Sequence, residues 1–560
     1  MAWLSVFRFT FVNSKPIPAV ISFSRKHWPV LLALGLYLSA VALSLLRSLP
    51  QTGGKLVYAL DDPYIHMAIA RSLSQHGVWG VTSLGFTGCS SAPLWTALLA
   101  LFFRLAGVRD WIPLLLNLSI GIIFLLWLNY FLKRRLSGSL PVFSLLLAVI
   151  FMTALPGLAF TGLEHGLQTF FILLFATLSA SLLSGEGGRR QELSLLALAP
   201  LQALVRFECL FPLLTVCILF ALRRKFRFAL LLLILGALPV LLYGAWSVSR
   251  GWYFLPNSVL LKGNIHFSSP KQAVKLLVFS YYKLAENPHL LVLLLGALAL
   301  IGRELRDGNG IWKPSTILLI IFSAVTVLHL QFAGTLNFFR YDAYLVALGI
   351  VAVGLPAWGI LAPWYAKLAR EGPAGLPLIL ALSLALLLSP LVLRASRAFL
   401  WIAPATRNIS QQQCRMAAFL DRYYRGRAVA LNDIGAVCYY ADIDCLDLFG
   451  LASLEVARLK QEGRYDSRAI AALAEKRGVK IAILYRKWYD NYGGLPAEWI
   501  EVGRWRILRN LVCGDDEVTF YATDRPAAGE LMKNLRDYSA LLPGDVLQSG
   551  RYRYEASGIN

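Results

Sequence analysis

The segment Leu60-Asp61-Asp62-Pro63-Tyr64-Ile65-His66-Met67-Ala68 follows the first strongly apolar stretch of the chain, residues 28–46. That stretch has the length and composition of a membrane-spanning helix. Two adjacent carboxylates at the mouth of such a helix are costly to place, and acids in that position usually carry a function. The acidic pair is therefore the first candidate for a functional site.

The composition of the chain is that of a polytopic membrane protein. Of its 560 residues, 57% are hydrophobic and only 15% are charged, and the mean hydropathy is +0.59. These values exclude an ordinary soluble protein. The formal net charge of +22 therefore indicates cytoplasmic anchoring charges and attraction to anionic lipid and phosphate, and we expect no nucleic-acid partner.

The positive charges predict the topology. The basic leader before residue 28 lacks a cleavage site and predicts a retained signal anchor with a cytoplasmic N-terminus. Residues 92–106 are short for a span. If they crossed the membrane, the Lys133-Arg134-Arg135 cluster would lie outside, against the positive-inside bias. The segment therefore predicts an interfacial or re-entrant helix within a large first outer loop, residues 48–109. About eleven spans result: residues 28–46, 111–132, 140–160, 167–183, a pair of short segments within 193–222, 228–248, 290–301, 315–330, 343–361 and 376–393.

The composition changes at Arg394, where the long apolar runs end. Residues 428–431 and 481–484 are typical of buried strands, and residues 411–423 and 467–477 of amphipathic helices. We therefore expect a membrane module over residues 1–393 and an extracytoplasmic α/β domain over residues 394–560 that caps the membrane site. If this domain lies in an oxidising compartment, two of Cys438, Cys445 and Cys513 could form a disulfide, and the sequence does not decide whether they do.

The two acids of the opening segment differ in their expected roles. Asp62 precedes Pro63, which is the pattern of a helix N-cap followed by a first helical residue, and the helix would run to Gly77. Asp61 lies before the cap, so its carboxylate suits a general base that takes a proton from a hydroxyl during sugar transfer. His66 lies one turn beyond Asp62 on the same face; we expect it to partner Asp62 or line an interface, and not to bind metal.

Other charged residues recur near the same expected face. Glu164, in a very short outer loop, is either an acid at a helix N-terminus or a substrate or metal contact facing Asp61. Arg206 and Glu208 form either a structural ion pair or part of a site. The remaining candidates are cations: Lys262, which either reaches lipid headgroups or neutralises a lipid-linked phosphate, and Arg340 in the last outer turn. Transfer from an anionic lipid donor needs this combination of a base for the nucleophile and cations for the leaving phosphate.

Several short motifs occur in a characteristic order: Asp61-Asp62-Pro63-Tyr64-Ile65, Ala70-Arg71, Ser91-Ala92-Pro93-Leu94-Trp95, Thr161-Gly162-Leu163-Glu164, Arg206-Phe207-Glu208, Asn257 with Lys262, Asn432-Asp433-Ile434-Gly435-Ala436 and Asp447-Leu448-Phe449-Gly450-Leu451. These motifs and their order resemble those of the C-type glycosyltransferases, polytopic enzymes that use polyprenyl-phosphate sugars at the outer membrane face. The set is most similar to that of the bacterial cell-wall arabinofuranosyltransferases that add terminal residues. Two departures concern loop shape: Phe207 stands where many relatives have Pro, and Pro63 where many have Ala.

The resemblance implies an inverting transferase that moves a sugar from a polyprenyl-phosphate donor to a hydroxyl on a glycan, lipid or protein. It implies no required cofactor, with a divalent metal optional, and a place in the bacterial inner membrane with a periplasmic C-terminal domain. Asp61 would be the general base, with Asp62 beside it, and Glu164 a second acid of the site. The residues expected to bind substrate or phosphate are His66, Arg206, Glu208, Asn257, Lys262 and Arg340.

Two other functions fit the composition. A lipid-linked glycan transporter or flippase without catalysis would favour charges along a midplane path and internal repeats, whereas here the charges gather at one face and no repeat is evident. A sugar-binding membrane receptor would not explain why acidic residues lie near the membrane.

Overall fold

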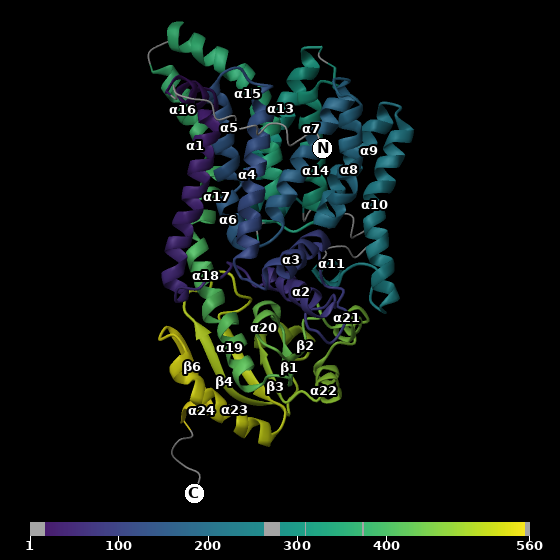
Figure 1. Cartoon of the computed structure of the whole chain (residues 1–560), viewed down its shortest axis with the longest axis vertical. Coiled ribbons are helices and arrows are strands. Elements are labelled where there is room, and N and C mark those ends of the chain that lie inside the picture. Colours follow the sequence, from purple (N-terminus) through teal and green to yellow (C-terminus); the bar gives the residue numbers. More distant parts are fainter. Residues whose placement is uncertain (1–16, 263–279, 309, 336, 372–374, 555–560) are drawn as a thin grey trace.

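The computed structural model describes residues 17–262, 280–308, 310–335, 337–371 and 375–554. A bundle of long helices forms one end of the molecule and a domain with a mixed sheet forms the other (Figure 1). Helices α2 (Asp62–His76) and α3 (Pro93–Ala106) lie between them. The acidic pair of the sequence therefore lies at the junction of bundle and sheet domain.

Eight helices of the described residues are long and apolar enough to cross a membrane, and a bent pair would make nine. The eleven spans expected from the sequence overcount by this criterion. The difference is α8 (Arg189–Val205), which begins with several polar residues, and α9 (Leu210–Leu222), which is 13 residues long. The other helices of the bundle are α1 (Ile17–Ser48), α4 (Ile112–Lys133), α5 (Ser139–Met152) with α6 (Leu155–Thr161), α7 (His165–Ser184), α10 (Phe226–Ser249), α13 (Pro288–Arg306), α14 (Pro314–Phe332), α15 (Ala343–Glu371), and the bent pair of α16 (Leu376–Leu387) with α17 (Ser389–Leu400).

The segment between α1 and α4 covers the end of the bundle. It contains the short η1 (Leu49–Thr52), α2 and α3, and α3 lies across the bundle end as the sequence predicts for residues 92–106 (Figure 1). Helix α2 ends at Gly77, whose φ of +71° gives the left-handed cap expected there. It begins at Asp62, so Asp61 takes the N-cap position that the sequence assigns to Asp62, and its side chain makes no capping bond within the helix.

The C-terminal domain is built on a six-stranded sheet in the order β2-β1-β3-β5-β4-β6. Strands β1 (Ala428–Leu431), β2 (Asp444–Asp447) and β3 (Ile481–Leu484) are parallel; β4 (Ile500–Ile507), β5 (Glu517–Ala522) and β6 (Val546–Ser549) are antiparallel. The predicted strands 428–431 and 481–484 are confirmed. The helices are α18 (Ile402–Gln411), α19 (Gln413–Tyr423), α20 (Gly435–Tyr440), α21 (Leu454–Gln461), α22 (Ser467–Lys476), α23 (Arg525–Tyr538) and α24 (Arg551–Tyr554).

Two further expectations concern this domain. The division between residues 393 and 394 falls inside α17, and α17, α18 and α19 lead from the bundle into the sheet domain as one helical run. All seven cysteines, which lie within the described residues, are free thiols, so the structure has no disulfide among Cys438, Cys445 and Cys513.

Candidate functional site

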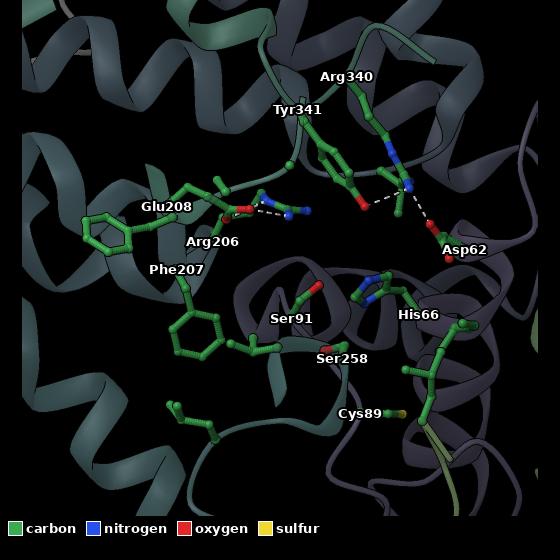
Figure 2. Close-up of a pocket in the computed structure, with 18 of the residues that line it drawn as sticks. Asp62, His66, Cys89, Ser91, Arg206, Phe207, Glu208, Ser258, Arg340 and Tyr341 are labelled. Carbon is green, nitrogen blue, oxygen red and sulfur yellow. Dashed lines mark hydrogen bonds and ion pairs between the residues drawn. The ribbon is translucent and has the colours of Figure 1, made fainter. Parts of the chain in front are cut away.

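A cavity of about 400 Å³ lies where the bundle meets the first loop. Its lining includes both polar and apolar side chains, and Phe207 lies beside Arg206 and Glu208 (Figure 2). Leu451 brings the C-terminal domain into the lining. The polar lining residues, which we call the polar wall, are Asp62, His66, Ser91, Arg206, Glu208, Ser258, Arg340 and Tyr341. The main apolar lining residues, which we call the apolar wall, are Phe207, Phe211, Leu255, Val259 and Phe332. The cavity therefore offers both charge and a surface for a hydrocarbon chain.

Arg340 and Asp62 form an ion pair across the polar wall. The Arg340 guanidinium donates to Asp62 Oδ2 and, over 3.2 Å, to the hydroxyl of Tyr341. The Arg340 side chain is 2% exposed, whereas Asp62 is 31% exposed. Within the described part of the chain, Nε of Arg340 is buried without a hydrogen-bond partner. A buried guanidinium N–H without a partner is a donor that an oxyanion can satisfy.

The turn before Arg340 is strained. Asn337, Phe338 and Phe339 have φ values of 34°, 58° and 61°. Non-glycine residues in this conformation cost of order 1–3 kcal/mol each and persist only where the surrounding structure enforces them. Arg394 of α17 supplies that constraint: it donates to the Phe339 carbonyl over 2.6 Å and to Asp342 over 3.2 Å. The fold thus uses the last helix of the bundle to hold Arg340 at the cavity.

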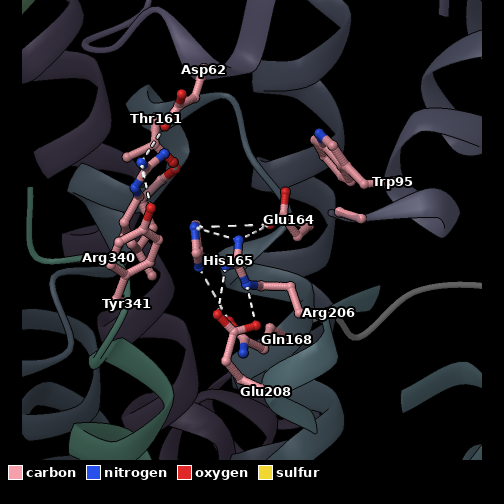
Figure 3. A network of polar contacts seen from close by, with 12 residues as sticks. Asp62, Trp95, Thr161, Glu164, His165, Gln168, Arg206, Glu208, Arg340 and Tyr341 are labelled. Atoms are coloured by element: carbon pink, nitrogen blue, oxygen red, sulfur yellow. Dashed lines mark hydrogen bonds and ion pairs between the residues drawn. The ribbon is translucent and has the colours of Figure 1, made fainter. Parts of the chain in front are cut away.

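Arg206 is the second cation of the cavity and sits at the centre of a buried network (Figure 3). It donates to both carboxylate oxygens of Glu208 over 2.9 and 2.7 Å, and to Glu164 over 2.6 Å. Its guanidinium also lies 5.4 Å from the centre of the Tyr341 ring, while that of Arg340 lies 4.7 Å from the same ring. Tyr341 is therefore shared by two cations that face one cavity.

His66 lines the same cavity from α2, as the sequence suggests (Figure 2). Its Nδ1 lies 2.7 Å from the hydroxyl of Thr96, which in turn lies 3.0 Å from that of Ser90. Burial lowers the pKa of His66, with nearby acids opposing the shift. A neutral imidazole whose Nδ1 is already hydrogen-bonded to Thr96 is suited to a hydrogen bond with a substrate hydroxyl. It is less suited to binding a phosphate, because it carries no positive charge.

Asp61 does not line the cavity, contrary to its expected role as general base. Its carboxylate accepts hydrogen bonds from the backbone N–H groups of Gly435, over 2.6 Å, and Ala436, over 2.7 Å. Burial, followed by the charge of Asp433, raises the pKa of Asp61 well above its usual range. The sequence could not reveal this because the partner groups lie more than 370 residues away and belong to the backbone.

Three other expected site residues have different surroundings. The side chain of Glu164 is fully buried behind Arg206 and does not line the cavity, so it is not positioned to touch a substrate there. Asn257 donates to the Gly450 carbonyl over 2.8 Å and joins α11 (Asn257–Lys262) to the C-terminal domain. The side chain of Lys262 lies outside the described residues. Of the nine predicted site residues, the structure therefore brings Asp62, His66, Arg206, Glu208 and Arg340 to the cavity.

The sequence missed several lining residues. Tyr341 directly follows Arg340, and Ser91 opens the Ser-Ala-Pro-Leu-Trp motif, so both lay within segments already singled out. The residues of the apolar wall could not be recognised in the sequence, because its phenylalanines occur among many similar apolar residues of the spans. Within the described residues, no group of three or more His, Cys, Asp or Glu side chains is arranged to hold a metal ion.

Comparison with known proteins places the fold. The helical bundle, the first loop that covers its end and the C-terminal sheet domain together form a C-type glycosyltransferase (GT-C-like) fold. A family model described as a domain of unknown function, DUF8728, matches residues 407–521, which lie within the C-terminal part of the chain. No curated protein matches the sequence.

Among solved structures, the chain is similar to ArnT from Cupriavidus metallidurans. The match to ArnT bound to undecaprenyl phosphate has a TM-score of 0.52 at 14% identity, and covers 88% of this chain and 99% of that one. The match to the apo state has a TM-score of 0.50 at 14% identity, over 90% and 99% of the two chains. An Archaeoglobus fulgidus oligosaccharyltransferase complexed with zinc and sulfate matches with a TM-score of 0.45 at 11% identity, over 91% and 74%.

Proposed function

We propose that this protein is an integral-membrane glycosyltransferase that moves a sugar from a polyprenyl-phosphate donor to a hydroxyl acceptor. The observation that carries the proposal is the cavity itself: Arg206 and Arg340 lie against the Tyr341 ring, Arg340 pairs with Asp62, and apolar side chains complete the lining. The likeness in fold to a protein solved with undecaprenyl phosphate supports the donor class. A phosphate between the arginines would leave the prenyl chain along the phenylalanines.

The general base in this proposal is Asp62. Its carboxylate takes the proton of the acceptor hydroxyl while the hydroxyl oxygen bonds to the anomeric carbon. The bond from that carbon to the phosphate oxygen breaks with inversion, and polyprenyl phosphate leaves with the electron pair. Arg206 and Arg340 stabilise the charge that develops on the leaving phosphate. The Nε of Arg340, which is buried without a hydrogen-bond partner among the described residues, offers a donor to this phosphate, and we propose that no divalent metal is required.

The sugar, the acceptor and the orientation extend this proposal. The sequence resemblance supports arabinofuranose as the sugar, and a glycan, lipid or protein hydroxyl as the acceptor. Cations such as Arg135, Arg223 and Lys313 gather at the end of the bundle remote from the sheet domain. The positive-inside bias therefore supports a cytoplasmic face there, with the cavity and the C-terminal domain on the periplasmic side of a bacterial inner membrane.

Release of polyprenyl phosphate is the reaction that tests the proposal. Purified protein in lipid vesicles is given a polyprenyl-phosphate pentose or hexose and a hydroxyl acceptor, and the lipid product is identified by mass. The proposal predicts release together with a glycosylated acceptor, unaffected by a chelator. Movement of the intact donor across the bilayer without release would instead support the flippase alternative.

A further inference from the structure

The membrane module holds helix α20 of the C-terminal domain at both of its ends. At the start of α20, the Asp61 carboxylate accepts the N–H groups of Gly435 and Ala436. At its end, Arg71 donates to the carbonyls of Tyr439, over 2.8 Å, and Cys438, over 3.2 Å. An oxygen acceptor at the first turn and a guanidinium donor at the last turn satisfy backbone groups that a helix leaves unpaired at its ends.

The contact with Asp61 depends on a glycine at position 435. A Cβ atom there would lie 2.1 Å from the backbone oxygen of Asp61 and 2.5 Å from its Oδ2. Both distances are far below van der Waals contact, so any larger residue would push the two segments apart. This close approach gives a physical reason for the Gly in the Asn-Asp-Ile-Gly segment, which the proposed reaction itself does not use.

Asp433 brings a second acid to this contact. The charge of Asp433 acts on Asp61 in the buried interface, and Asp433 itself accepts hydrogen bonds from Gln413, over 2.8 Å, and from the hydroxyl of Tyr485, over 3.0 Å. Bringing two carboxyl groups together away from water costs free energy.

We infer that Asp61 is a positioning residue through which the C-terminal domain sets the direction of Asp62. Successive residues at the start of a helix point about 100° apart, so anchoring the Asp61 carboxylate in the sheet domain fixes the turn that carries Asp62 to the cavity. The inference rests on the proposed role of Asp62 as general base. It makes the C-terminal domain an active part of the site and not only a cover.

Gly435→Ala tests this inference from outside the cavity. Gly529→Ala is the matched control, because an added Cβ at Gly529 meets nothing within 4 Å. We expect Gly435→Ala to lower kcat at least tenfold, with the dissociation constant for polyprenyl phosphate changed less than twofold, and the control to match the wild type. In an Asp62→Asn background, Gly435→Ala should cause no further loss of the residual rate, since Asp61 acts only through Asp62.

Several results would overturn the inference. Wild-type kcat in Gly435→Ala would do so, and so would an equal loss with and without Asp62, which is the behaviour of a general structural defect. If Gly435→Ala does not fold, Asp61→Asn replaces it, with the same expectations. If the wild-type protein shows no transfer, the proposed function fails. Hydrogen exchange of residues 62–66 then tests whether the C-terminal domain holds the turn that carries Asp62. Faster exchange in Gly435→Ala than in Gly529→Ala supports the inference, and equal exchange refutes it.

Discussion

The carboxylates of Asp61 and Asp62, neighbours in the chain, bind to two different parts of the molecule. That of Asp61 is buried against the backbone of Gly435 in the sheet domain, and that of Asp62 pairs with Arg340 at the cavity. A single turn of chain thus joins the C-terminal domain to the proposed catalytic base. The acid of the pair that lines the cavity is Asp62, which the sequence assigned to capping α2.

Replacing Asp62 should therefore abolish transfer. Asp62→Asn keeps the shape of the side chain but cannot take the acceptor proton, and loss of a general base lowers kcat by about 10²–10⁴-fold. Binding of polyprenyl phosphate, measured by titration, should persist, because Arg206 and the apolar wall are unchanged. A variant that retains more than a tenth of the wild-type kcat would remove Asp62 from the mechanism.

Arg206 should matter for folding as well as for phosphate binding. Arg206→Gln leaves the fully buried Glu164 without its partner, and an uncompensated buried charge costs about 3–5 kcal/mol. We expect a clear drop in Tm in detergent. The double variant Arg206→Gln with Glu164→Gln should recover much of that stability without recovering phosphate affinity. Equal Tm values for the single and double variants would show that the pair is not coupled.

The apolar wall should select long-chain donors. Phe211 lines the cavity, and covering a phenylalanine side chain is worth about 1.5–3 kcal/mol. Phe211→Ala should raise KM about tenfold for a full-length polyprenyl-phosphate sugar and little for a short-chain analogue. Kinetics with both donors measure the difference. An identical change for the two donors would place the prenyl chain elsewhere.

Docking of the C-terminal domain should weaken as the pH rises. Burial and the charge of Asp433 raise the pKa of Asp61 above its usual 3.8, so the folded protein keeps its proton to a higher pH than the unfolded chain does. The associated stability is complete below pH 3.8 and is lost as the pH rises through the folded-state pKa. The other titratable groups that act on Asp61 or Asp433 here are Tyr485, Cys414 and Cys513.

Hydrogen exchange of α20, measured from pH 4 upward, follows this effect. Exchange corrected for its intrinsic pH dependence should increase with pH in the wild type. Asp433→Asn removes one of the two acids, so its corrected exchange should change less. A wild-type profile that is flat over this range, or one that rises equally in the variant, would contradict the assignment.

The sequence predicted the parts of this molecule that follow from local pattern. Strands 428–431 and 481–484 form a buried apolar sheet centre, and residues 92–106 were too short to span and lie across the bundle end. The cations Arg206 and Arg340 were identified because charge is rare near a membrane. The two spans expected within residues 193–222 correspond to α8 and α9, which are too short or too polar to count as spans by length and composition.

The roles of the acids could not be predicted in the same way. Whether Asp61 or Asp62 faces the cavity depends on where Gly435, 374 residues away, meets the first loop. Glu164 resembled a catalytic acid because its loop is short and near the bundle end, but Arg206 lies between it and the cavity. Such assignments depend on tertiary contacts that a single sequence does not encode in any local pattern.

A structure of the protein with bound polyprenyl phosphate tests the central claim most directly. The account predicts the phosphate within hydrogen-bond distance of both Arg206 and Arg340, with the first prenyl units against Phe207 and Phe211. A phosphate bound at the opposite end of the bundle, or a prenyl chain that bypasses the cavity, would contradict it.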